Sequence, residues 1–321
     1  MAGYILRRVL WGFVLLLIVS ALTFVVFYVL PSADPAQLRA GRNASPETLA
    51  AIRHNLGLDR PLTAQYWTFL KRLVLHADLG YSYQSSAPVG GLIADRMGAT
   101  ISLTAGAFAV WMLMSIPVGI VSAVRRGTWL DRLTMGAALV AVSVPVYWLG
   151  LVALYLFSDD IGQWPLLPGA NSYVPLAESP WDWFTSLLLP WGVLAATFAA
   201  IYARLLRGNL LEALSEDFVR TARSKGLSER RVVLGHALPA AITPLVTLAG
   251  LDVGLLLGGA VLTETVFQIP GIGGLSYDAI RQANYPVIQG TVLVAAAFVI
   301  VATIVVDVLY AYLDPRVRVA A

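Results

Sequence analysis

The residues best suited to chemistry lie in one polar stretch, residues 216–239, between two long apolar runs. The stretch is basic, with cationic side chains at Arg220, Arg223, Lys225, Arg230 and Arg231. Residue types alone leave two interpretations open. The stretch is either a solvated positive loop that anchors the neighbouring helices or a surface that a partner binds.

The spacing within residues 216–239 predicts two short helices that separate at Gly226. Ser228 is a suitable N-cap for the second helix, and Glu229 puts a carboxylate near the positive end of that helix. Each helix has a face suited to packing, formed by Val219, Ala222 and Arg223 in the first and by Val232, Val233 and Leu238 in the second.

Other chemistries find no support in the residue types. The chain has no cysteine, and its three histidines (His54, His76 and His236) lack metal-ligand spacing. It contains no phosphate loop of the form Gly-x4-Gly-Lys-Ser/Thr, no Gly-x-Ser-x-Gly and no His-Glu-x-x-His. The sequence therefore predicts neither a metal site nor an ATPase site. The basic residues form no contiguous patch, so we expect no nucleic-acid partner.

The elements around the polar stretch are apolar. At 321 residues, 58% hydrophobic and 13% charged, with a mean hydropathy of +0.73, the chain is predicted to be an all-α polytopic membrane protein. The first apolar run follows Arg7 and Arg8 and is too long for a signal-peptide core, so we expect an uncleaved first span. The six expected spans cover residues 9–30, 101–124, 133–157, 184–206, 240–262 and 287–312.

The connectors between the spans predict the topology. Basic residues gather after the second, fourth and sixth spans, whereas the opposite short loops are mainly acidic and carry only Arg281. The positive-inside rule therefore puts both termini and residues 216–239 in the cytosol. The basic residues counted between spans or after the last one include Arg125, Arg126, Arg132, Arg204, Arg207, Arg316 and Arg318.

Residues 31–99 form the largest polar region and are expected outside the cell. Ser45, Pro46 and Glu47 provide an N-cap, an N1 proline and a first-turn acid, and the resulting helix is expected to stop at Gly57. Pro61 opens a second helix with an apolar stripe at helical spacing, which we expect to pack on its neighbours or on the membrane surface.

Two features lie inside the expected fifth span or just after it. Gly250, Gly254 and Gly258 recur every fourth residue and predict close packing with another helix. Asp252 is a carboxylate at mid-membrane, which costs about 2.5–3.5 kcal/mol on insertion scales and must therefore face protein or water. It lines a polar path or satisfies a neighbouring helix, and the sequence leaves both open. Glu264 is a second candidate path residue, beside a turn formed by Gly271, Gly273 and Gly274.

The polar stretch also resembles a known family. ABC-importer permeases carry a Glu-Ala-Ala-x3-Gly-x9-Ile-x-Leu-Pro loop that docks into the ATPase. Here Arg, Thr and His replace Glu, the first Ala and Ile, as is typical of permeases of the dipeptide/oligopeptide type. The resemblance implies that the ATPase-docking residues are Arg220, Thr221, Ala222, Arg223, Gly226, Ser228, Arg230, Arg231, His236, Leu238 and Pro239.

Further matches extend the resemblance over nearly the whole chain. They are the run Gly57-Leu-Asp-Arg-Pro-Leu62, the segment Ala77-Asp-Leu-Gly80, which usually reads Gly-Asp-Leu-Gly, and the closing Leu309-Tyr-Ala-Tyr-Leu-Asp-Pro-Arg-Val-Arg318. The implied organisation is a first transmembrane helix (residues 1–30), an extracytoplasmic helical region (31–99) and a permease core (100–321) whose coupling loop is residues 216–239.

The resemblance implies the permease subunit of an ATP-driven importer for peptides in the inner membrane. Its implied partners are a second homologous permease, two ATP-binding domains that hold ATP and Mg²⁺, an extracytoplasmic binding protein and the bilayer. Relatives that carry nickel or sugars keep the substrate open. A proton-driven secondary carrier would call for inverted repeats that the sequence does not show. An intramembrane hydrolase would need a nucleophile–base pair, and the sequence offers none.

Overall fold

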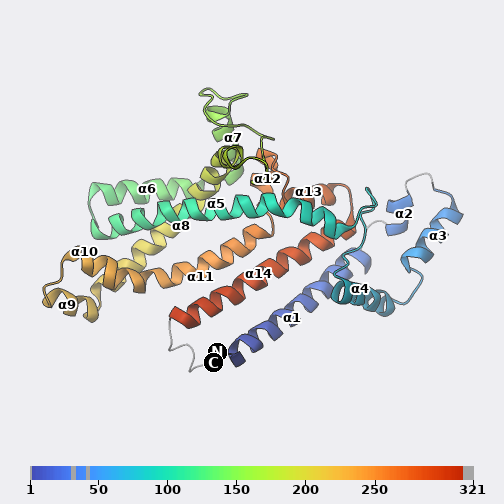
Figure 1. The fold of residues 1–321 in the computed structure, drawn as a ribbon, viewed down its shortest axis with the longest axis horizontal. Coiled ribbons are helices and arrows are strands. Elements are labelled where there is room, and N and C mark those ends of the chain that lie inside the picture. Colours follow the sequence, from blue (N-terminus) through green and yellow to red (C-terminus); the bar gives the residue numbers. More distant parts are fainter. Residues whose placement is uncertain (1, 30–33, 41–43, 314–321) are drawn as a thin grey trace. The chain divides into compact units, whose positions relative to one another are not determined.

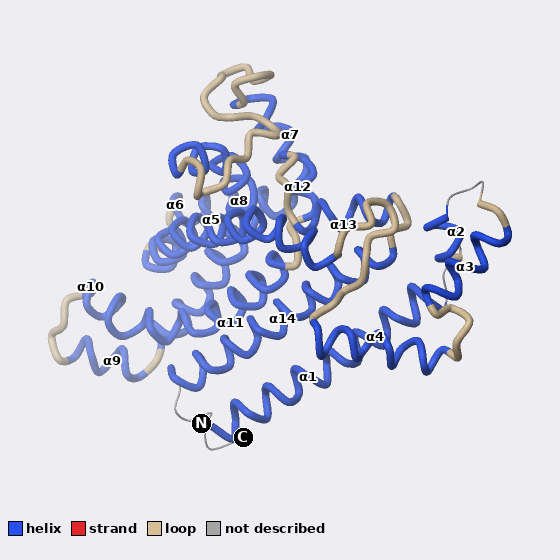
Figure 2. Tube along the Cα trace, turned by 45° about the vertical axis from the view of Figure 1, so that its right-hand side comes forward, coloured by secondary structure: helices blue, strands red, loops and turns tan. Residues whose placement is uncertain are grey.

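The computed structural model describes residues 2–29, 34–40 and 44–313 (Figure 1). Arg316 and Arg318, the basic residues expected after the last span, lie outside the described residues. Within those ranges the backbone forms helices joined by loops, and the only β-pairing consists of two isolated bridges (Figure 2). The expected all-helical fold class is confirmed.

The helices are named in chain order. They are α1 (Ala2–Phe24), η1 (Val25–Val29), α2 (Pro35–Ala40), α3 (Pro46–Leu56), α4 (Leu62–His76), α5 (Val89–Val124), α6 (Trp129–Ser143), α7 (Val146–Phe157), α8 (Pro180–Ser215), α9 (Asp217–Ser224), α10 (Glu229–Val232), η2 (Val233–Ala237), α11 (Leu238–Leu257), α12 (Val261–Phe267), α13 (Ile272–Arg281) and α14 (Tyr285–Leu313), where η marks a π-helix.

The described residues contain five helical stretches long and apolar enough to cross a membrane. A sixth crossing is obtained if α6 and α7, which are bent by 103° relative to each other, count as one span. The five continuous stretches are Ile5–Val29, Val89–Val124, Pro180–Ser215, Glu229–Leu257 and Tyr285–Val308.

The expected continuous span over residues 133–157 is therefore wrong in detail. The helix stops at Ser143, Val144 is extended (φ −91°, ψ 128°), and a new helix starts after Pro145. Proline has no N–H to donate and disfavours helical backbone in the residue before it. The break was not predicted because the apolar run is long enough for one span, and hydropathy carries no information on backbone hydrogen bonds.

Boundaries of other spans also differ from the expectation, and the fourth span covers Pro180–Ser215 rather than residues 184–206. The second span starts at Val89 rather than at residue 101, and the fifth ends at Leu257 rather than at residue 262. Gly259 ends the latter helix with a left-handed backbone (φ +123°), and a Cβ added there would lie 2.5 Å from the Cα of Gly273. Conformation and space both require glycine at this turn.

The chain folds as two compact units. The first is built from parts of Met1–Thr100, Gly254–Glu264 and Pro270–Ile304, and the second consists mainly of Ile101–Val253 with Thr265–Ile269. The first unit thus combines N-terminal residues with most of the last membrane helix.

In the first unit, small residues let α14 approach its neighbours closely. A Cβ added to Gly12 of α1 would lie 2.8 Å from Ile300. A Cβ at Gly254 or Gly258 would lie 2.7 Å or 2.8 Å from the methyl groups of Ala302 and Ala295. Gly250, the third member of this stripe, is partly buried. Figure 1 shows α1 and α14 running side by side.

Glu264 forms the polar centre of the first unit. Its side chain is 1% exposed and accepts hydrogen bonds from the Thr100 hydroxyl (2.9 Å) and the Gly274 N–H (2.8 Å). Thr100 in turn accepts a bond from the N–H of Ile272 (2.8 Å). Gly271 packs against the carboxylate. Glu264 therefore fixes the glycine turn before α13. Its expected role in a path stays a prediction.

In the second unit, α8 is the central helix. It packs against α6 and α7, and buried residues recur along it from Ser186 to Ala213. The ring of Trp191 occupies the space where a Cβ on Gly106 of α5 would lie, and its indole N–H donates to the carbonyl of Ser102 (3.1 Å). Trp111 stacks on Phe198 with ring centroids 4.6 Å apart. These contacts fix α5 against α8.

The Glu264 cluster gives a stability prediction. Glu264→Ala removes the acceptor of two buried donors, each of which costs about 1–3 kcal/mol when left unpaired. We expect a clearly lower melting temperature of the purified protein in detergent. Glu178→Ala is the matched control, because that side chain is exposed in a loop. Equal melting temperatures for the two variants would contradict the role assigned to Glu264.

Candidate functional site

Residues 216–239, called the elbow from here on, form two short helices joined at Gly226, as predicted. Helix α9 ends in a Schellman motif, in which the Gly226 N–H donates to the Arg223 carbonyl (2.9 Å) and the Leu227 N–H to the Ala222 carbonyl (3.4 Å). Gly226 is left-handed (φ +76°), and an added Cβ would meet no atom within 4 Å. Glycine is favoured at this position by the left-handed backbone conformation and not by a lack of space for a side chain.

An ion pair closes the elbow across this turn. Arg223 of α9 donates through Nη2 and Nε to the two carboxylate oxygens of Glu229 of α10, at 2.6 Å and 3.1 Å. Two parallel bonds favour one angle and one distance between the helices, with side chains that are 41% and 56% exposed. Ser228 lies at the N-cap position of α10 with extended backbone, although its hydroxyl makes no capping bond.

The second arm of the elbow continues into the membrane helix through a π-helical segment. The Leu238 N–H donates to the Val233 carbonyl, five residues back. Pro239 explains this geometry, because it has no N–H and its ring would crowd the carbonyl four residues earlier. The sequence shows Pro239, but its position in the motif did not predict a π-helix.

One face of the elbow is packed and the other is open. Val219, Val232, Val233 and Ala237 are at most 4% exposed and hold the elbow against the rest of the second unit. The opposite surface carries the exposed residues Arg220, Thr221, Lys225, Arg230, Arg231 and His236. Of the residues predicted for docking, Ala222 is buried and Arg223 is engaged within the elbow itself.

Two apolar residues on the open surface were not predicted. Phe218 is 46% exposed and Leu234 is 42% exposed, beside the cationic side chains. Large exposed apolar groups next to cations are typical of a protein-binding surface, where they act as anchors. The sequence did contain a signal for this surface, because Phe218 is the one aromatic residue of α9.

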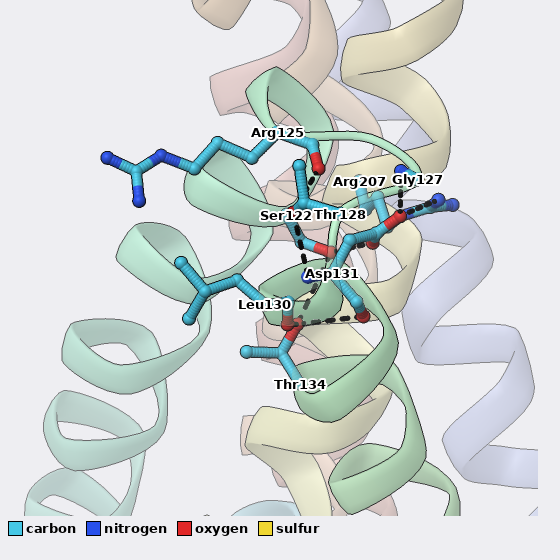
Figure 3. Close-up of polar contacts among 8 residues, drawn as sticks. All are labelled: Ser122, Arg125, Gly127, Thr128, Leu130, Asp131, Thr134 and Arg207. Atoms are coloured by element: carbon cyan, nitrogen blue, oxygen red, sulfur yellow. Dashed lines mark hydrogen bonds and ion pairs between the residues drawn. The ribbon is translucent and has the colours of Figure 1, made fainter.

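A buried ion pair fixes α8 shortly before the elbow (Figure 3). Arg207 donates from Nε and Nη2 to the two carboxylate oxygens of Asp131, at 2.7 Å and 2.8 Å. The Gly127 N–H (2.9 Å) and the Ser122 hydroxyl also donate to this carboxylate. The turn between α5 and α6 is thereby attached to α8. From the sequence, Arg207 was expected only to contribute to the membrane topology. Its partner Asp131, 76 residues away, was not predicted.

Asp252, the candidate path residue, lies in the second unit, away from the elbow in sequence. Its carboxylate accepts a bond of 2.6 Å from the hydroxyl of Tyr202 on α8. Tyr202 is 1% exposed, whereas Asp252 is partly buried. Of the two alternatives left open by the sequence, the contact with a neighbouring helix is the one observed here.

The contacts described for the elbow, Arg207 and Asp252 include no nucleophile paired with a base. Among the described residues, no group of three or more His, Asp or Glu side chains could hold a metal ion. Comparison with known proteins is decisive. The family model described as "Binding-protein-dependent transport system inner membrane component" matches residues 115–319.

The chain belongs to this family.

The model for the N-terminal part of such membrane components matches residues 1–104 of the permease. A putative peptide transport system permease protein of Brucella abortus (strain 2308) is 42% identical over 318 residues, 99% of both chains. A glutathione transport system permease protein of Salmonella typhimurium is 41% identical over 318 residues, again 99% of both.

The family expected from the elbow motif is therefore confirmed. The permease is a multi-pass membrane protein and the transport subunit of an ABC importer of the peptide type. As a member of a binding-protein-dependent system, it works with a binding protein and an ATPase. It is a transport subunit and not itself the ATPase.

The Arg223–Glu229 pair gives a prediction for the elbow. Arg223→Glu or Glu229→Arg places like charges across the turn, so hydrogen exchange of the amides in residues 217–232 should become faster. The double exchange restores opposite charges and should recover much of the protection. Arg220→Glu is the matched control, because its ion pair with Asp217 is 75% and 93% exposed. Failure of the double variant to recover protection would contradict the clamp.

The Asp252–Tyr202 bond gives a second prediction. Asp252→Leu leaves the buried Tyr202 hydroxyl without an acceptor, which costs about 1–3 kcal/mol. We expect a lower melting temperature for Asp252→Leu and a nearly unchanged one for Asp252→Asn, whose amide oxygen still accepts. A thermally stable Asp252→Leu permease that has lost transport would instead assign Asp252 to the path.

Proposed function

We propose that this permease is the membrane-spanning subunit of an ATP-driven importer for peptides. The names of its relatives support this substrate class, because they refer to peptides and to glutathione, which is a tripeptide. The nickel and sugar substrates that the sequence left open have no such support among these relatives.

The observation that carries the proposal is the construction of the elbow. Its inner face is buried, its turn is closed by the Arg223–Glu229 pair, and its outer face presents cations around Phe218 and Leu234. A rigid, exposed and chemically mixed surface suits docking to an ATPase that pushes on it. We assign ATP and Mg²⁺ to two partner ATP-binding domains and a homologous permease to the other half of the path.

The proposed orientation places both termini and the elbow in the cytosol. Arg125 and Arg126 are exposed at the turn between α5 and α6, and the cations of the elbow are exposed as well. The opposite connectors carry the exposed tryptophans Trp164 and Trp181, which suit the outer interface. Residues 31–99 then face the binding protein that delivers the peptide.

This arrangement suggests how movement reaches the membrane helices. Closure of the ATPases moves the elbow, and its two arms continue into α8 and α11. The Asp131–Arg207 pair lies eight residues before the end of α8, about 12 Å along the helix, and couples α8 to the turn between α5 and α6. The elbow therefore acts on α8 and α11 directly and, through the Asp131–Arg207 pair, on the turn between α5 and α6.

The proposal is tested with the purified complex in lipid nanodiscs, by adding peptides, nickel or sugars with the binding protein and measuring ATPase activity. We expect stimulation by peptides. Phe218→Ala should weaken ATPase association about tenfold or more, as for anchors that contribute at least about 1.4 kcal/mol.

Leu166→Ala is the matched control, because Leu166 is 71% exposed but lies in a loop between α7 and α8. Stimulation by nickel or a sugar and not by peptides would reject the substrate class. Unchanged ATPase association of Phe218→Ala would reject the elbow as the docking surface.

A further inference from the structure

The first unit contains a cavity of ≈ 300 Å³ between α2, α3, α4 and the loop that follows α4. This volume is in the range of small-molecule sites. Its walls combine aromatic rings, including Tyr28 and Tyr83, with three guanidinium groups from Arg39, Arg60 and Arg72. The transport mechanism proposed above does not use this cavity.

All three arginines are exposed, and none of them forms an ion pair among the described residues. Nearby, Arg53 pairs with Asp34, and the His54 Nδ1 lies 2.9 Å from the Asp59 carboxylate. Among the described residues that line the cavity, Asp78 alone carries a carboxylate, and it accepts a bond from the Gly80 N–H (2.8 Å). Three cations around one cavity with a single carboxylate favour an anionic ligand.

Electrostatic coupling places two of the arginines near the aromatic wall. Arg72 acts on the hydroxyl of Tyr28, and Arg39 acts on that of Tyr83. Burial raises the pKa of Tyr83 well above its ordinary value, while the Arg39 charge acts in the opposite direction. The Tyr83 phenol therefore stays protonated near neutral pH and remains a neutral hydrogen-bonding group.

The side of α4 that lines the cavity differs from the side that packs on α1 and from the exposed apolar side. With about 100° of rotation per residue, Thr68 and Arg72 share one side of α4. Trp67 and Val74 lie on another side and are 57% and 53% exposed. A third side packs on α1, where the Tyr66 hydroxyl lies 2.9 Å from the Ser20 hydroxyl. One side of α4 is thus packed, a second is apolar and exposed, and the side with Arg72 lines the cavity.

We propose that this cavity binds a small anionic peptide, with its carboxylates held by Arg39, Arg60 and Arg72 and its ammonium group directed to Asp78. The presence of both charge signs and the size of the cavity favour a peptide over a simple anion. The choice of a peptide among small anions rests on the proposed function. The cavity would then be an extracytoplasmic holding site on the permease itself, selective for acidic peptides.

The test uses the full chain in phosphatidylcholine nanodiscs without binding protein, titrated with the dipeptide alanyl-glutamate by calorimetry. Arg72→Gln should weaken binding about tenfold or more, since a charge-assisted bond contributes about 1.5–3 kcal/mol. Lys71→Gln is the matched control: it removes the same charge from the neighbouring residue, which does not line the cavity. Binding by the wild type with loss only in Arg72→Gln supports the proposal.

Other outcomes would overturn it. Equal affinities of Arg72→Gln and Lys71→Gln, with melting temperatures matching the wild type, would show that the cavity does not bind the peptide. Binding of phosphatidylglycerol or inorganic phosphate without binding of the dipeptide would assign the arginines to a lipid headgroup or a free anion. Arg39→Gln provides a second variant should Arg72→Gln fail to fold.

The proposed function is judged separately, by peptide-stimulated ATPase activity of the wild-type complex. If that activity is present but the dipeptide does not bind the permease alone, only the holding site is rejected. If the dipeptide binds and no peptide stimulates the complex, the cavity remains a peptide site while the import function fails.

Discussion

Close backbone approach is the constraint on which this structure depends. Lipid tails are as apolar as leucine, so burial from water does not drive membrane helices together, and packing and polar bonds must do so. Gly106 admits the Trp191 ring, while Gly254 and Gly258 admit the alanines of α14. Buried polar contacts at Glu264 and Asp131 then fix the arrangement that the small residues permit.

The second unit shows how such an arrangement produces a mechanical part. Helix α8 carries buried residues from Ser186 to Ala213 and is attached to the α5–α6 turn by Arg207. It then continues into an elbow whose angle is fixed by Arg223 and Glu229. In the proposed function, a force applied to the exposed side of the elbow passes through these contacts to the membrane helices, so transport depends on the stiffness of this connection.

The sequence predicted the helical fold, the elbow and its break at Gly226, because periodicity, composition and capping are local properties. It failed where the deciding partner is remote or is a backbone group. Glu264 was predicted from its charge alone, but its partners are Thr100 and the N–H of Gly274. The interruption of α6 and α7 at Pro145 was readable in principle, since proline lacks a donor, yet the apolar run concealed it.

Gly226 shows how a single position sets the direction of the elbow. No atom lies near the place where its side chain would be, so volume plays no part there. What favours glycine there is handedness, because an ordinary L-amino acid reaches this backbone conformation only at a cost of about 1–2 kcal/mol. The chain turns at Gly226 in the sense opposite to its helices. A residue of the opposite chirality would adopt this backbone conformation as readily as glycine does.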